Sequence, residues 1–248
     1  IHVDAIAKWA AEIGTGFSRP FAVASLGGTG RAELTPCSDY DIVFLFEDPI
    51  ETGATRNFVR DLQEATLHTR SFRDRFGFSF QALPYAFEDI PALRDKDLNA
   101  FLDLAPVHDP GGLCMEFRDR IRTNFDPFEH FLHVRSLWLR QLERAGAMAE
   151  RIDRFDLKND ALRVFLAAIW TLGGGNFEHS HEVYARLCAE DPRDLEAFYF
   201  LLRVRCWIHL RRPPGGIATA MGSHEEDLMG FEDFDSFGDW LYEGAVTT

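Results

Sequence analysis

Apolar and polar positions in the first ninety residues repeat with two different periods. Three short runs, rich in β-branched and aromatic residues and bounded by turn residues, predict strands at 21–26, 41–46 and 76–87. Apolar residues at helical spacing predict helices over 1–14 and 54–75. This alternation of strands and helices predicts a small sheet domain of the α/β class.

The strand pattern stops near Asp97, and helical periodicity continues from there to residue 210. The predicted helical segments are 98–105, 113–122, 128–152, 161–172, 181–190 and 194–210. The expected fold class is therefore α/β (α+β), with a small mixed sheet in a domain over residues 1–125 and an all-α helical bundle over residues 126–248.

The charge of the chain restricts its partners. With 26 Lys and Arg against 40 Asp and Glu, the net charge is −14, which argues against a nucleic-acid-binding surface because phosphate neutralisation needs clustered basic residues. No Lys or Arg follows Arg212, whereas eight acidic residues do. We interpret this tail as a solvated acidic surface, with docking of a basic partner as the alternative.

Cysteine spacing and hydropathy suggest the compartment. The four cysteines lie far apart without a CxxC pair, which is typical of reduced thiols in a cytoplasmic protein. No apolar stretch approaches the roughly 20 residues of a membrane-spanning helix, so we expect no membrane partner.

Two aspartates at the start of the second predicted strand are the first candidate site residues. Asp39 and Asp41 are two positions apart, so their side chains point to the same face of a strand with Cα atoms about 6.5–7 Å apart. A divalent metal bridges carboxylates at that separation, and Mg²⁺ or Mn²⁺ bound there can neutralise a nucleoside triphosphate. We therefore predict that both residues are catalytic metal ligands.

A glycine-rich turn between the first two strands supplies the other candidates. Gly27 and Gly28 let a phosphate approach the backbone, and the guanidinium of Arg31 is suited to clamp phosphate oxygens. Ser38 is placed to cap or orient the aspartate pair, and we predict that it binds the nucleotide together with Gly27, Gly28 and Arg31. Each feature alone is commonly an ordinary turn or strand cap, whereas their combined order is much harder to meet by chance.

The motifs "GGTGRAEL" (27–34) and "PCSDYDIVFLF" (36–46) resemble the signature of the DNA polymerase β-like nucleotidyltransferase superfamily. Within it, they are most similar to the bacterial uridylyltransferases of the nitrogen-signalling protein PII, whose pattern is GGxGRxEL followed by PxSDxD. The glutamine synthetase adenylyltransferases carry a related form with a different glycine and arginine order. More loosely, 101–122 resembles the family's helix–turn–helix, and 154–170 and 200–210 resemble its later segments.

The resemblance implies a nucleotidyltransferase domain over 1–125 and a helical domain over 126–248. It implies transfer of UMP or AMP from UTP or ATP, with magnesium or manganese, to an acceptor such as a hydroxyl of a regulatory protein like PII. Two departures from the family pattern leave the target protein open: "DLKNDALR" (156–163) replaces a glycine-rich run, and Pro106 stands where an arginine is common.

Several alternatives stay open at the level of sequence. One alternative to a protein-modifying enzyme is a small-molecule or toxin-type nucleotidyltransferase. Another is a catalytically silent nucleotide-binding and protein-interaction module. A third metal-binding carboxylate is unassigned, with Glu88 and Asp89 as weak candidates beyond the third strand. The nucleobase, the acceptor, the oligomeric state and whether the chain is part of a larger regulatory enzyme are also undetermined.

Overall fold

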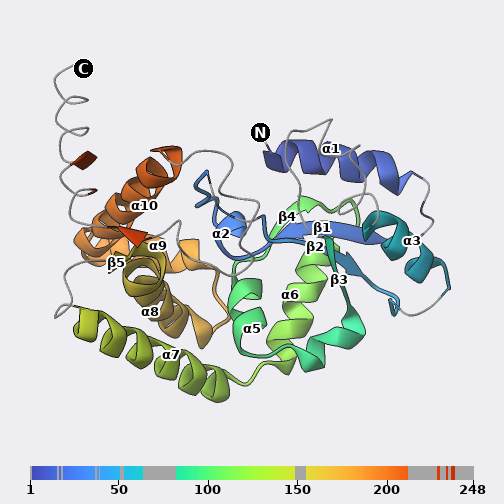
Figure 1. Cartoon of the computed structure of the whole chain (residues 1–248). Helices are drawn as coiled ribbons and strands as arrows, with labels where there is room; N and C mark the ends of the chain where they lie inside the picture. Colours follow the sequence, from blue (N-terminus) through green and yellow to red (C-terminus); the bar gives the residue numbers. More distant parts are fainter. Residues whose placement is uncertain are drawn as a thin grey trace. The chain divides into compact units, whose positions relative to one another are not determined.

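The fold is known from a computed structural model of the chain. The structure describes residues 2–15, 17, 19–36, 38, 40–50, 53–63, 82–148, 155–211, 228–229, 233 and 236–237. Within these residues the chain is an α+β protein with a small mixed four-stranded sheet, a two-stranded antiparallel sheet and a majority of helix (Figure 1). The acidic tail beyond Arg212 lies largely outside this part.

The described strands and helices follow the predicted order over much of the chain. The strands are β1 (Phe21–Ser25), β2 (Ile42–Phe46), β3 (Ala82–Ala86), β4 (Ala105–His108), β5 (Phe155–Asp156) and β6 (Leu228–Met229). The helices are α1 (His2–Gly14), α2 (Gly27–Gly30), α3 (Gly53–Gln63), η2 (Phe87–Ala92), α5 (Asp95–Leu102), α6 (Leu113–Asn124), α7 (Pro127–Met148), η3 (Leu157–Leu162), α8 (Arg163–Gly174), α9 (Ser180–Glu190) and α10 (Arg193–Arg211).

Contacts between residues divide the chain into two compact units. The first contains Ile1–Leu34, Asp39–His130 and Asn176–Ser180, and the second contains Thr35–Ser38, Phe131–Gly175 and His181–Thr248. The predicted boundary between residues 125 and 126 stays a prediction.

The four-stranded sheet of the first unit has the order β3-β2-β1-β4. β1 is antiparallel to both neighbours, while β2 and β3 are parallel, so the sheet is mixed as expected. Every residue of β1 and β2 is buried, because α1 covers one face of the sheet while α5 and α6 lie on the other (Figure 1). The aromatic residues Phe21, Phe44 and Phe46 pack with Trp9 of α1 in one apolar core.

The fourth strand corrects the sequence prediction. Residues 98–105 were expected to be helical, but α5 ends at Leu102 and β4 begins at Ala105. β4 pairs with β1 at the edge of the sheet, where Pro106 is tolerated because an edge strand needs hydrogen bonds on one side only. The segment 101–122 is therefore helix, strand and helix in turn.

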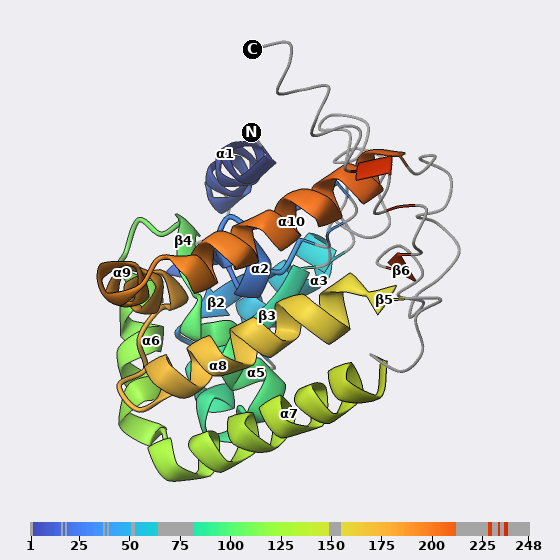
Figure 2. The ribbon, with the colours of Figure 1, turned by 90° about the vertical axis from the view of Figure 1, so that its left-hand side faces the viewer.

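The second unit is mainly helical. Residues of α8, α9 and α10 share one apolar core, and Figure 2 shows α10 above α8 with the two helix axes roughly parallel. The segment "DLKNDALR" (156–163) contains the π-helix η3, and the Asp156 carboxylate just before this helix accepts hydrogen bonds from Asn159. In the described part of the chain, no helix combines the length and the apolar character that crossing a bilayer requires.

Candidate functional site

The glycine turn connects β1 to the start of β2 through the short helix α2. Gly27 has a φ of +50°, a backbone conformation that favours glycine because it has no Cβ. The N–H of Gly30 donates to the carbonyl of Leu26 at 2.9 Å, and the N–H of Arg31 donates to that of Gly27 at 3.0 Å. The predicted contact of Gly27 and Gly28 with a phosphate stays a prediction.

Asp41 lies directly against this turn. The Leu26 N–H donates to the Asp41 carbonyl at 2.9 Å, and the Asp41 N–H donates to Oγ1 of buried Thr29 at 3.0 Å. A Cβ placed on Gly27 would lie 3.5 Å from Oδ2 of Asp41. The structure thus brings together the turn and one of the two predicted aspartates, and the Asp41 residue is exposed.

Asp39, the other predicted metal ligand, lies outside the described residues. Tyr40 between the two aspartates is described, and burial raises the pKa of its phenol. The phenol therefore stays neutral at physiological pH and adds no negative charge beside the aspartates.

The direction of β3 argues against Glu88 and Asp89 as metal ligands beside Asp41. Since β3 is parallel to β2, with Ile42 opposite Ala82, these residues follow the end of β3 that is farthest from Asp41. Five strand residues correspond to about 16 Å. The Asp89 carboxylate instead accepts the N–H of Ala86 at 2.7 Å, which caps η2.

Ser38 belongs to a compact turn in the second unit. Its Oγ accepts the N–H of Thr35 at 2.9 Å and lies 2.9 Å from Thr35 Oγ1 and 3.4 Å from Nη1 of Arg205. Thr35 Oγ1 also lies 2.8 Å from Nδ1 of buried His209. Ser38 therefore helps to fix its own turn within the second unit, and its predicted contact with a nucleotide stays a prediction.

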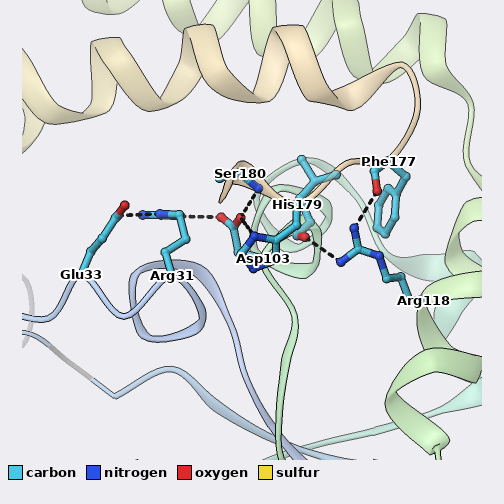
Figure 3. Close-up of polar contacts among 8 residues, drawn as sticks. Arg31, Glu33, Asp103, Arg118, Phe177, His179 and Ser180 are labelled. Atoms are coloured by element: carbon cyan, nitrogen blue, oxygen red, sulfur yellow. Dashed lines mark hydrogen bonds and ion pairs between the residues drawn. The ribbon is translucent and has the colours of Figure 1, made fainter. Parts of the chain in front are cut away.

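The side chain of Arg31 is only 5% exposed and is paired with the carboxylates of Glu33 and Asp103. Its Nε lies 2.6 Å from Oε2 of Glu33, and its Nη1 lies 2.5 Å from Oδ2 of Asp103 (Figure 3). The predicted contact of Arg31 with a triphosphate stays a prediction. The observed pairs show that this guanidinium is bound by protein carboxylates on two sides.

The donor set at this turn is compatible with a hard divalent cation. Mg²⁺ and Mn²⁺ prefer carboxylate oxygens, and Asp41 presents one at the surface, two positions from Asp39. In the described ranges, no group of three or more histidine, cysteine, aspartate or glutamate side chains is arranged to hold a metal ion.

Thr29 was not among the predicted site residues, and its role can be tested. We expect Thr29→Val to lower the free energy of unfolding by about 1–2 kcal/mol, because the Asp41 N–H loses its acceptor while the side-chain shape is kept. Urea denaturation measures this loss.

Thr123→Val is the matched control for this substitution. The exposed Thr123 hydroxyl donates to the carbonyl of Asp119, so its removal should change the free energy by less than about 0.5 kcal/mol. Equal effects of the two substitutions would show that Thr29 does not fix Asp41.

Comparisons with known proteins add no family assignment. No family model matches the chain, and a search of curated proteins found no match.

Proposed function

We propose that the protein is a metal-dependent nucleotidyltransferase of the DNA polymerase β-like type. It transfers UMP or AMP from UTP or ATP to an acceptor, which we infer to be a hydroxyl of a regulatory protein such as PII. The observation that carries the proposal is the contact between the glycine turn and Asp41. A Cβ placed on Gly27 would lie only 3.5 Å from Oδ2 of Asp41. A phosphate on the turn would lie beside a metal-binding group, as phosphoryl transfer requires.

The proposal includes the finer domain assignment. Residues 1–125 would form the nucleotidyltransferase domain and residues 126–248 a helical bundle domain that positions the acceptor. The mixed sheet and the helical second unit support this assignment. The widely spaced cysteines favour action in the cytoplasm.

The residues of the turn have distinct roles in this proposal. Asp39 and Asp41 would hold Mg²⁺ or Mn²⁺, which when bound supplies positive charge against the triphosphate and activates the acceptor oxygen. Gly27 and Gly28 let the triphosphate approach the backbone. Thr29 fixes the backbone of Asp41 through its hydroxyl.

The reaction itself needs positioning more than covalent participation by the protein. The acceptor oxygen attacks the α-phosphorus in line with the bond to the bridging oxygen of the β-phosphate. The new oxygen–phosphorus bond forms as that bond breaks, and pyrophosphate leaves. The hydroxyl proton is released to solvent.

Incubation with α-labelled UTP or ATP, Mg²⁺ and a bacterial lysate tests this function. We expect label on a discrete protein band, with none when EDTA replaces Mg²⁺. Label on a small molecule would identify the small-molecule or toxin-type alternative. The absence of any transfer with either nucleotide would contradict the proposal.

A protein-interaction module without transfer activity is the second candidate, and helix α7 favours it. Leu132, Leu139 and Leu142 recur at helical spacing and are each at least 40% exposed. Exposed apolar side chains on one helix face are typical of surfaces that contact other proteins. Under this alternative, the chain would capture a partner through α7 and transfer no label to it.

A further inference from the structure

Asp103, at the end of α5, is a fully buried carboxylate that the proposed mechanism does not use. Its exposed fraction is 0%, which is rare for an acidic side chain unless it is paired. The Oδ2 atom lies 2.5 Å from Nη1 of Arg31, and the Oδ1 atom accepts the N–H of Ser180 at 3.0 Å. Both carboxylate oxygens therefore have defined donors (Figure 3).

A second contact links residue 103 to the glycine turn through the backbone. A Cβ placed on Gly30 would lie 1.9 Å from the carbonyl oxygen of Asp103, which is far inside van der Waals contact. The turn is thus seated directly on the end of α5. Residue 103 therefore meets the turn at two points, through the close approach of its carbonyl to Gly30 and through the ion pair of its carboxylate with Arg31.

The segment 176–180, which binds Asp103 through the Ser180 N–H, is also held by Arg118. Phe177 has a φ of +54°, which is unusual for a bulky residue and persists only where the surroundings enforce it. Arg118 supplies that support, donating from Nη2 to the Phe177 carbonyl at 3.0 Å and from Nη1 to the Leu102 carbonyl at 3.3 Å. Figure 3 shows Arg118 and Asp103 holding the two ends of this segment, which reaches Ser180.

We propose that Asp103 is a positioning residue, which with the braced segment 176–180 holds the glycine turn in place against Asp41. The route to Asp41 is short, because Thr29 in the same turn accepts the Asp41 N–H. The inference rests on the proposed function, since it assigns Asp103 the task of keeping the phosphate-binding turn and the metal ligand in register. Supporting groups of this kind affect activity without touching the substrate.

Amide hydrogen exchange of Asp103→Asn tests the positioning independently of activity. The substitution keeps the side-chain size but removes the charge that binds Arg31. We expect the amides of Gly30 and Arg31 to exchange about tenfold faster or more, with α6 unchanged.

Asp109→Asn is the matched control in the same unit. The Asp109 carboxylate accepts the N–H groups of Leu113 and Cys114 and caps α6, so its loss should affect α6 and leave the turn unchanged. If the turn responds equally to both substitutions, or if exchange in Asp103→Asn rises evenly across the unit, Asp103 is only a stabilising residue and the inference fails.

Nucleotide binding is the second measurement. It separates the proposed function as a nucleotidyltransferase from the proposed positioning role of Asp103. At a temperature where each variant is fully folded, we expect Asp103→Asn to weaken binding of Mg²⁺ and UTP or ATP by about 10- to 100-fold. Unchanged affinity in the folded variant would overturn the positioning role. If the parent binds no nucleotide, the proposed function fails, and the exchange data alone decide whether Asp103 positions the turn.

If Asp103→Asn does not fold, Arg31→Lys tests the same ion pair by hydrogen exchange. It keeps the positive charge and loses the fork that joins Glu33 to Asp103. Faster exchange confined to residues 27–31 is again the expected result, and protection equal to that of the parent would contradict the inference.

Discussion

Asp41→Asn is expected to lower the transfer rate about 100-fold or more, because the proposed metal site loses one of its two carboxylates. The fold should remain intact, since the backbone of Asp41 is held by Leu26 and Thr29 and not through its carboxylate alone. The variant should melt no lower than the parent, because the substitution removes like-charge repulsion with Asp39. Transfer of α-labelled nucleotide and circular dichroism measure the two effects.

Asp61→Asn is the matched control for this prediction. Asp61 lies on α3 with its side chain 64% exposed, paired with the neighbouring Arg60, and it is remote in sequence from the glycine turn. The control should retain parental transfer. Near-parental transfer by Asp41→Asn at saturating Mg²⁺ would show that Asp41 is not a metal ligand.

Gly30→Ala is expected to have the largest effect on stability. The added Cβ would lie 1.9 Å from the Asp103 carbonyl oxygen, and this neighbour is backbone, which cannot rotate away. We expect a loss of about 2 kcal/mol or more in the free energy of unfolding, which corresponds to about 4–8 °C in melting temperature. Thermal and urea denaturation measure it.

Gly28→Ala, two residues earlier, separates packing from phosphate binding. Its Cβ would lie 3.9 Å from Nη2 of Arg31, an ordinary contact, and alanine favours the helix by about 0.5–1 kcal/mol. Stability should be equal or slightly higher, while nucleotide affinity should fall because the methyl group occupies the approach of the phosphate. A loss of stability like that of Gly30→Ala would contradict this distinction.

The central strands were predictable because their local pattern and their environment agree. β1 and β2 are short, rich in β-branched and aromatic residues and buried on both faces, so a compact apolar run between turn residues identifies each of them. The proximity of the glycine turn to Asp41 was predictable for a similar reason, since they are neighbours along the chain. Their contact needed only the antiparallel pairing of adjacent strands.

The edge strand β4 was missed because its pattern is weak. Four residues including Pro106 and His108 carry no alternation that distinguishes a strand, and pairing with β1 determines the conformation. The bracing of the turn was missed for another reason. Arg31 and Asp103 are separated by 72 residues, and local sequence does not encode such a pair.

One signal in the sequence does point to Asp103. The residue stands alone in the apolar run "FLDLAPV" (101–107), and a single acid in such a run is a candidate for a buried carboxylate that requires a cationic partner. The same reasoning would have suggested Asp103 as a carboxylate partner for Arg31, in addition to Glu33, which is close to Arg31 in the sequence.

Calorimetric titration with a UTP or ATP analogue, in which a methylene group replaces the α,β-bridging oxygen, tests the central claim most directly. The parent should bind the analogue in the presence of Mg²⁺ and not in EDTA, and the double variant Asp39→Asn, Asp41→Asn should lose this metal-dependent binding while remaining folded. No binding by the parent, or binding that depends on neither the metal nor the two aspartates, would contradict the claim that the glycine turn and the aspartate pair form a nucleotide site.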